Sequence, residues 1–145
     1  METMASLCHS QWECKYHVVI IPKNRKKILF KEIRNYLRDL LRELARQRES
    51  QILEGELCVD HVHMLLSIPP KYSVAQVVGY IKGKSAICIA RTYLGRRQNF
   101  SGQNFWARGY YVSTVGLDED VIRHYIQNQQ KEDNRLEQMK LLQLP

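Results

Sequence analysis

Hydrophobic and polar residues alternate along the chain in a pattern that predicts four strands. KYHVVIIP, residues 15–22, is rich in β-branched and aromatic residues, and Pro22 ends it. QILEGELC (51–58) and HVHMLLSI (61–68) are separated only by Val59 and Asp60, which predicts a tight antiparallel hairpin. FWARGYYVSTVG, residues 105–116, follows a polar loop and is the fourth expected strand.

Helical spacing predicts two helices between these strands. From Phe30 to Arg48, apolar residues recur with a period near 3.6, at Ile33, Leu37, Leu40 and Leu44. The second helix should begin after Ser73, a plausible N-cap, and end before Gly95. Its expected buried residues are Val74, Val77, Val78 and Ile81. We therefore expect each helix to bury one face and expose the other.

A third helix should begin at Asp118, whose side chain can cap it while Glu119 and Asp120 favour the positive end of the helix dipole. The preceding order of strand, helix, strand, strand, helix, strand is that of a split βαβ, or ferredoxin-like, fold. It predicts an α+β domain of RRM-like type, with an antiparallel sheet and helices on one face. The other sheet face should be open to a ligand or partner.

The length of 145 residues suits a single domain, with a core at 12–130 and a polar tail at 131–145. The residues before the first strand read as a polar lead-in without a signal peptide, and no apolar run is long enough for a membrane span. The cysteines, at Cys8, Cys14, Cys58 and Cys88, have no C-x-x-C or zinc-ribbon spacing. Free thiols in a reducing cytoplasm are the simplest interpretation.

Composition then indicates the kind of partner. The chain is 44% hydrophobic and 26% charged, within the range of globular proteins and outside that of disordered ones. Its net charge of +7 and isoelectric point near 9.3 give a positive surface potential, which favours anionic polymers such as nucleic acid.

The most unusual local feature is the pair His61 and His63 in an otherwise apolar strand. Because strand side chains alternate, Val62 faces one side of the sheet while both histidines face the other, close enough to reach one ion. Two partly exposed strand histidines without a ligand are the simpler alternative. A catalytic divalent site would need further ligands from elsewhere.

The third helix carries candidates for these missing groups. In HYIQNQQ, Tyr125 and Gln129 are four residues apart and share one helical face. The amide of Gln129 could be a third metal ligand, and the phenol of Tyr125 a nucleophile beside the ion. Tyr125 also lies among apolar residues, so an amphipathic core tyrosine is the alternative interpretation.

Taken together, these segments resemble the single-tyrosine HUH-endonuclease transposases, the TnpA-type enzymes of small insertion sequences. The resemblance covers nearly the whole chain, in the words WECKYHVVIIPK, ILEGELCVDHVHMLLSIPPKYSV, GYIKGKS, FWARGYYVSTVG and HYIQNQ. It implies that His61 and His63 are the HUH metal ligands, that Gln129 completes the metal site, and that Tyr125 is the nucleophile.

The resemblance also implies the reaction and the partners. The expected enzyme cleaves and rejoins single-stranded DNA at insertion-sequence ends through a 5′-phosphotyrosine intermediate, and it recognises DNA hairpins in a prokaryotic cytoplasm. Mg²⁺ or Mn²⁺ suits a mixed imidazole and oxygen site, although imidazole also suits zinc. The family forms homodimers with composite active sites, so we expect an obligate homodimer.

Basic and aromatic side chains are candidates for DNA contacts. The basic ones are Arg25, Lys26, Lys27, Lys82, Lys84, Arg96 and Arg97, and the aromatic ones are Phe100, Phe105 and Trp106. For each basic residue alone, a solvated surface charge is the alternative.

Two other functions compete. An RRM-like module that only binds single-stranded nucleic acid or a hairpin, including a domesticated transposase, would account for the charge and the fold. It would not account for the two histidines or for the spacing of Tyr125 and Gln129. A phosphoesterase with two H-x-[ST] motifs is excluded, because the words HSQ, HVV and HYI do not match that motif.

Overall fold

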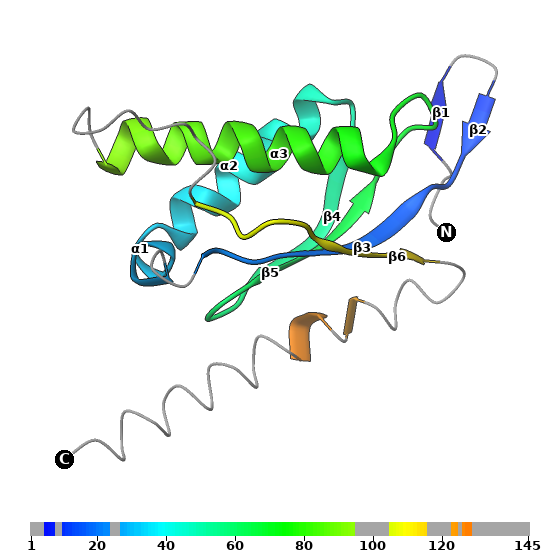
Figure 1. The fold of residues 1–145 in the computed structure, drawn as a ribbon. Coiled ribbons are helices and arrows are strands. Elements are labelled where there is room, and N and C mark those ends of the chain that lie inside the picture. The colour runs from blue at the N-terminus through cyan, green and yellow to red at the C-terminus, as the bar shows by residue number, and fades with distance from the viewer. Residues whose placement is uncertain are drawn as a thin grey trace.

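A computed structural model describes residues 5–7, 10–23, 27–94, 105–115, 123–124 and 126–128. The main elements follow in the order β3 (Lys15–Ile20), α1 (Lys27–Glu32), α2 (Arg34–Gln47), β4 (Gln51–Leu57), β5 (Val62–Ser67), α3 (Val74–Ile89) and β6 (Tyr111–Val115). The four strands form one antiparallel sheet in the order β4-β5-β3-β6 (Figure 1). The predicted α+β class and the predicted order of elements are confirmed.

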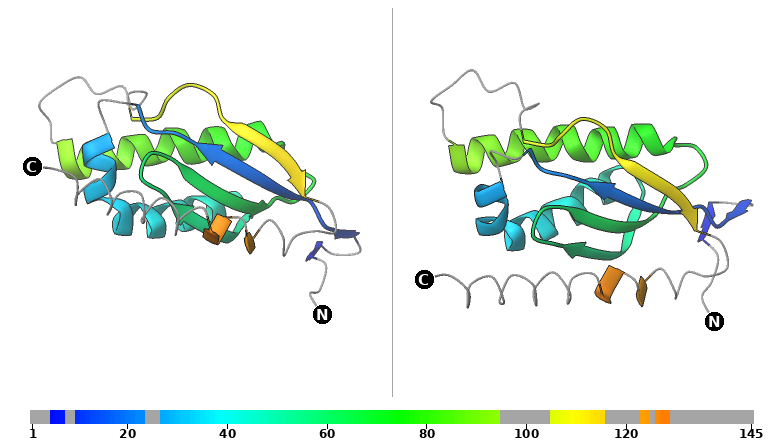
Figure 2. Two further views of the ribbon diagram at one scale, coloured as in Figure 1. Left: turned by 90° about the horizontal axis from the view of Figure 1, so that it is seen from below. Right: turned by 60° about the horizontal axis from the view of Figure 1, so that its bottom comes forward.

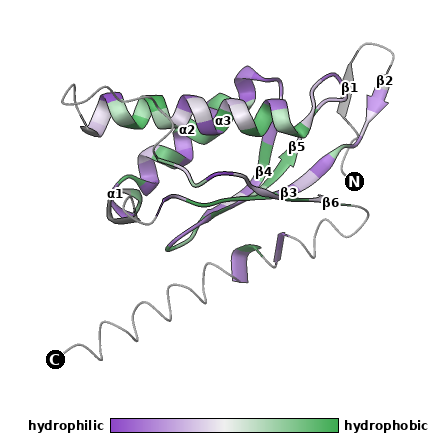
Figure 3. Ribbon diagram, in the orientation of Figure 1, coloured by the Kyte–Doolittle hydropathy of each residue, from purple (hydrophilic) through white to green (hydrophobic). Residues whose placement is uncertain are grey.

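The core lies between this sheet and helices α2 and α3, which cover one of its faces (Figures 1 and 2). Alternation along β5 turns Val62, Met64 and Leu66 toward the helices, and none of the three is more than 1% exposed. Hydrophobic residues, green in Figure 3, accordingly run along β5 and recur on α3. The predicted core face of this strand is confirmed.

Helix α3 begins as its sequence predicts. The backbone N–H of Gln76 donates to Ser73 Oγ at 3.0 Å, and the N–H of Ser73 donates to Gln76 Oε1 at 2.8 Å, which is a complete capping box. Val77, Val78 and Ile81 are fully buried. A π-helical turn, Ala90–Leu94, extends the helix to the residue before Gly95.

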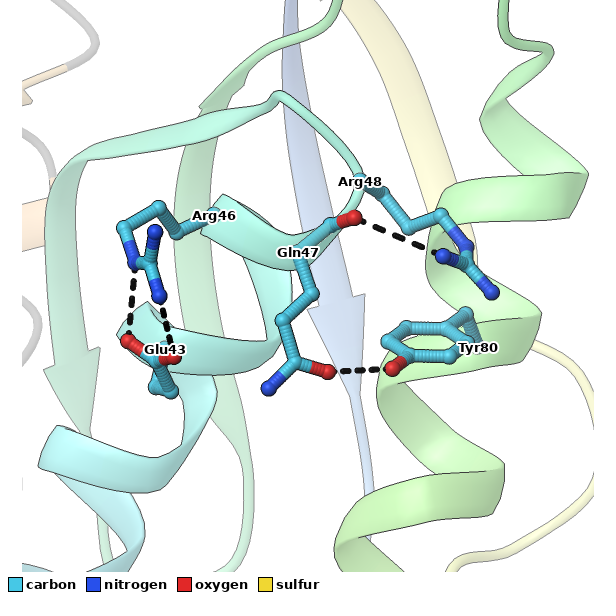
Figure 4. Close-up of polar contacts among 5 residues, drawn as sticks. All are labelled: Glu43, Arg46, Gln47, Arg48 and Tyr80. Atoms are coloured by element: carbon cyan, nitrogen blue, oxygen red, sulfur yellow. Dashed lines mark hydrogen bonds and ion pairs between the residues drawn. The ribbon is translucent and has the colours of Figure 1, made fainter.

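The C-terminal end of α2 is held against α3 by the ring of Tyr80 (Figure 4). The Tyr80 hydroxyl donates to Gln47 Oε1, and the guanidinium of Arg48 lies 3.7 Å from the ring centroid. Arg46 donates to Glu43 at 2.9 and 2.5 Å on the exposed side of α2, where ion pairs contribute little to stability. Tyr80 and its two partners therefore fix how the two helices meet.

The first helix and the lead-in differ from the prediction. The helix expected from Phe30 to Arg48 is divided at Ile33, whose φ of −102° and ψ of 10° depart from helical geometry. Phe30 and Ile33 are both buried, so the bend keeps both against the core. The expected lead-in contains a hairpin of β1 (Ala5–Leu7) and β2 (Ser10–Trp12), whose three-residue strands are too short to give a clear pattern.

The fourth strand is shorter than predicted because Gly109, at φ +76°, turns the chain before β6 begins. Upstream of it, the Lys23 N–H donates to Phe105 O at 2.9 Å and the Ala107 N–H to Ile21 O at 2.7 Å. The ammonium of Lys82 binds the carbonyls of Ala107 and Gly109 at 2.9 and 2.6 Å. These contacts hold the turn against α3.

Phe105 and Trp106 belong to the core and are not surface aromatics. Phe105 is 0% exposed and Trp106 is 4% exposed, and Trp106 Nε1 donates to Ser85 Oγ at 2.8 Å. The expectation that these two rings stack on unpaired bases is therefore wrong. Phe100, the third candidate, lies outside the described residues.

Removing the Phe105 ring should lower stability without a specific effect on DNA binding. We expect Phe105→Ala to reduce the free energy of unfolding by about 3–5 kcal/mol, the usual cost of emptying a buried aromatic site. Urea denaturation measures this loss, and Val112→Ala, at a position 39% exposed, is the control. A variant with unchanged stability and weakened DNA binding would contradict this role.

The sheet face away from the helices was predicted to be open. In the structure, this face is covered along β5. Leu65 points to that face and is 0% exposed, and His63 is 6% exposed. The helical residues 123–124 and 126–128, orange in Figure 2, lie on this side of the sheet, and Ile126 is fully buried. Among the described residues, the face is open at β6, where Tyr111 is 58% exposed.

Candidate functional site

His61 and His63 meet at the end of the β4–β5 hairpin. The Cys58 N–H donates to the His61 carbonyl at 2.8 Å and closes the turn, so His61 immediately precedes β5 and His63 lies within it. Their Nε2 atoms are 2.7 Å apart, and the ring centroids are 4.4 Å apart. The two imidazoles therefore direct their Nε2 atoms to one point.

His17 joins this pair from the neighbouring strand. Val19 of β3 lies opposite His63, and His17 lies opposite Leu65, so His17 shares the face of His63. His17 Nε2 is 3.0 Å from His63 Nδ1, and the two rings stack with centroids 5.2 Å apart. Pairing the first and third predicted strands by their alternation could have identified His17 from the sequence.

Asp60 makes the corresponding contact with His61. Its Oδ1 lies 2.6 Å from His61 Nδ1, and the two residues are adjacent in the turn. Each of the two converging histidines thus directs Nε2 toward the other and uses Nδ1 for a separate partner. Histidines that bind metals are usually oriented in this way, by a carboxylate or another acceptor at the second nitrogen.

The surroundings of His63 and His17 favour the neutral form of these two imidazoles. Burial, followed by the nearby His61 and His17, lowers the pKa of His63 to about 4. Burial also lowers the pKa of His17. Near neutral pH these rings are therefore uncharged, which is the form in which histidine binds a metal.

The donor atoms fit a divalent ion. Two nitrogens bound side by side to one ion, each at about 2.0–2.1 Å, lie roughly 3 Å apart, close to the 2.7 Å between the Nε2 atoms here. Within the part of the chain that the structure describes, Cys58, His61 and His63 form a group whose donor atoms lie within 4.8 Å of one another. Cys58 was not predicted from the sequence, because only the closed turn brings its thiol to the histidines.

Tyr125 and Gln129 lie outside the described residues. Arg123 and His124 precede Tyr125 in helical geometry, and residues 126–128 follow it in the same geometry. These flanking residues lie on the sheet face that carries the histidines (Figure 2). The roles of Tyr125 and Gln129 stay predictions.

The basic candidates are described only in part. Arg25, Lys26, Arg96 and Arg97 are outside the described residues, and Lys27 begins α1. Lys84 is exposed on α3, where its ammonium lies 6.0 Å from the Tyr80 ring centroid. Lys82 is half-buried, which lowers its pKa, and its ammonium already binds two carbonyls.

Two general expectations concern disulfides and membranes. Cys14, Cys58 and Cys88 form no disulfide in the described part of the chain. Within the same residues, no helix combines the length and the apolar character that crossing a bilayer requires.

Known proteins resemble this chain over most of its length. The family described as "Transposase IS200 like" matches residues 10–129. The transposase of insertion sequence IS200 from Salmonella typhimurium is 43% identical over 136 residues, which are 94% of this chain and 90% of that protein. The ISDra2 transposase TnpA of Deinococcus radiodurans is 31% identical over 119 residues, 81% of this chain and 85% of its own length.

Solved structures agree with these sequence matches. A crystal structure described as that of a transposase from Deinococcus radiodurans R1 aligns with a TM-score of 0.66 at 30% identity, over 87% of this chain and 98% of the other. A REP-associated tyrosine transposase bound to a REP hairpin aligns with a TM-score of 0.58 at 16% identity, over 85% of this chain and 68% of the other. At this identity, the match shows similarity of fold alone. From these matches, this chain belongs to the IS200-like family of transposases.

Proposed function

We propose that this transposase cleaves and rejoins single-stranded DNA at insertion-sequence ends, with Tyr125 as nucleophile and a divalent ion bound by His61 and His63. The convergence of the two Nε2 atoms at 2.7 Å is the observation that carries the proposal. The fold supports it as well, since the strand order and crossovers are those of the ferredoxin-like split βαβ. In this proposal, the expected C-terminal helix carries Tyr125.

In this proposal, the amide oxygen of Gln129 is the third metal ligand beside the two imidazole nitrogens. This mixed donor set suits Mg²⁺ or Mn²⁺. When bound, such an ion neutralises charge that develops on the phosphate and orients the scissile bond. Gln129 is four residues after Tyr125, so on a helix the nucleophile and the third ligand face the same way.

The chemistry at Tyr125 is a reversible exchange of ester bonds. The phenol loses its proton as its oxygen bonds to phosphorus, and the bond from phosphorus to the 3′ oxygen breaks and leaves a 3′ hydroxyl. The product is a 5′-phosphotyrosine. A 3′ hydroxyl from another strand can attack this ester and release the phenol, so joining needs no external energy source.

His17 and Asp60 act as positioning residues. For the Nε2 atoms of His61 and His63 to offer lone pairs, each ring must carry its proton on Nδ1. His61 then donates to Asp60 at 2.6 Å, and His63 donates to His17 Nε2 at 3.0 Å. Each contact fixes the tautomer and the rotation of one ligand.

The role of His17 can be separated from a packing role by two substitutions. His17→Phe keeps a ring but removes the acceptor, and we expect Mn²⁺ affinity to fall about 10–100-fold, as for other partners of ligating histidines. His17→Gln offers an amide oxygen and should restore part of that loss. Titration of free Mn²⁺ by electron paramagnetic resonance measures both. Wild-type affinity in His17→Phe would remove His17 from this role.

DNA contacts extend beyond the metal centre. The candidates for neutralising phosphates of a hairpin are Arg25, Lys26, Lys27, Lys82, Lys84, Arg96 and Arg97. Lys84 is the stronger of the two on α3, because it is exposed whereas Lys82 binds carbonyls. The net charge of +7 supports this footprint.

The direct test uses labelled single-stranded DNA with the hairpins that flank the gene. In a denaturing gel, we expect a covalent protein–DNA band with Mg²⁺ or Mn²⁺ and none with EDTA. Binding measured on a native gel should persist in EDTA. Binding without any covalent band, over several metals and flanking substrates, would instead support a module that only binds hairpins.

We also propose a homodimer in which Tyr125 of one subunit acts with the histidines of its partner. Tyr125→Phe and His63→Ala subunits, each inactive alone, should then regain activity when mixed, because one of the two composite sites is intact. Strand transfer by the mixed proteins, with light scattering to give the oligomeric state, measures this complementation. A mixture shown to contain dimers with one subunit of each variant, but that stays inactive, would show that each Tyr125 serves its own subunit.

A further inference from the structure

Cys58 brings a thiol to the two histidines. Leu57 pairs with Val62 and both face the helical core, so Cys58, the next residue, points to the opposite face with His61. The hydrogen bond from the Cys58 N–H to the His61 carbonyl fixes this approach. The thiol sulfur and the histidine nitrogens lie within 4.8 Å of one another, and Cys58 is 0% exposed.

This donor set differs in kind from the proposed catalytic one. Two imidazoles and a thiolate are ligands for thiophilic divalent ions of the zinc class, whereas Mg²⁺ and Mn²⁺ prefer oxygen. To bind an ion held at the two Nε2 atoms, the Cys58 sulfur has to lie about 2.3 Å from that ion. The thiol proton passes to solvent as the bond from sulfur to the metal forms.

We propose that Cys58 makes this centre a binding site for zinc-class ions, in which Cys58, His61 and His63 bind the ion together and block catalysis. Zinc with three protein ligands is four-coordinate and retains a single exchangeable position. The proposed reaction also needs Gln129 and room for phosphate at the ion. The inhibitory consequence rests on the proposed function, whereas binding of the ion through Cys58 does not.

Cobalt reports the thiolate bond directly. Co²⁺ added to the full-length protein should give the near-ultraviolet charge-transfer band of a cobalt–thiolate bond. Cys58→Ser should remove this band, while Cys88→Ser, at a free cysteine on α3, should keep it. The zinc affinity of Cys58→Ser should fall by at least the roughly 10–100-fold seen when only an outer partner of a ligand is lost.

A second measurement uses the unaltered protein, because Cys58 is buried and its substitution could disturb folding. The cadmium NMR resonance of the wild-type complex should lie far downfield, as for thiolate-bound cadmium.

In strand-transfer assays at fixed Mg²⁺, zinc should inhibit the wild type and Cys88→Ser at lower concentrations than it inhibits Cys58→Ser.

The outcomes separate this inference from the proposed function. Absence of both the cobalt band and the downfield cadmium resonance in the wild type would overturn ligation by Cys58, even if Mg²⁺-dependent cleavage is found. Equal zinc inhibition of wild type and Cys58→Ser would overturn the inhibitory role. A cobalt band in a protein that never forms a covalent DNA adduct would support ligation and refute the proposed function.

Discussion

Replacing Tyr125 with phenylalanine is expected to abolish covalent attachment to DNA and strand transfer while leaving hairpin binding intact. The substitution removes one oxygen, the atom that would bond to phosphorus, and keeps the aromatic ring. Loss of a nucleophile lowers catalysis by a factor on the order of 10⁴ or more. Quantifying strand-transfer products with labelled DNA measures the loss.

Tyr111 supplies a matched control for this experiment. Its ring lies 5.9 Å from that of His17, and it is 58% exposed at the open end of the same sheet face. Tyr111→Phe should therefore form the covalent adduct at close to the wild-type rate. An adduct that persists in Tyr125→Phe and disappears in Tyr111→Phe would assign the nucleophile to β6.

The second large effect is expected at His63. His63→Ala removes one of the two converging nitrogens and leaves the buried Nε2 of His17 without its contact at 3.0 Å. We expect metal affinity to fall by more than the roughly 10–100-fold associated with outer partners, and cleavage to fall with it. Isothermal titration with Mn²⁺ and the denaturing-gel assay measure the two quantities.

The control for His63 is another histidine near the proposed nucleophile. His124 is exposed and adjacent to Tyr125 in sequence, but its direction differs by about 100° around a helix. His124→Ala should keep metal binding and cleavage. If His63→Ala, shown by thermal denaturation to be folded, binds Mn²⁺ as the wild type does, the metal site lies elsewhere.

The fold was predictable where local signals agree with tertiary packing. The capping box of Ser73 and Gln76, the hairpin of β4 and β5, and the core face of β5 all follow from short-range patterns. The pattern failed where a single backbone angle decides, as at Gly109, which shortens the fourth strand. It also failed for Phe105, because burial in the core is a tertiary property.

The site, too, was predictable where local strand patterns are sufficient. His61 and His63 were identifiable because strand alternation places neighbours at positions i and i+2 on one face. His17, 46 residues away from His63 in sequence, required the pairing of β3 with β5. The positions of Asp60 and Cys58 beside the histidines depend on how the turn closes, and the alternation of strand side chains does not describe a turn. The sheet face that carries the histidines is covered because residues 123–124 and 126–128 lie on that side, and this placement is a tertiary property.

Covalent attachment of DNA to Tyr125 is the step on which the proposed reaction depends. Trypsin cleavage after Arg123 and Lys131 isolates the peptide HYIQNQQK, whereas Tyr110 and Tyr111 fall in a separate peptide. Mass spectrometry of nuclease-treated and trypsin-treated covalent complex, formed with Mg²⁺, should find a nucleotide phosphate on Tyr125 in HYIQNQQK. A nucleotide on the Tyr110–Tyr111 peptide, or no modified tyrosine in a complex of confirmed covalent character, would show that Tyr125 is not the nucleophile.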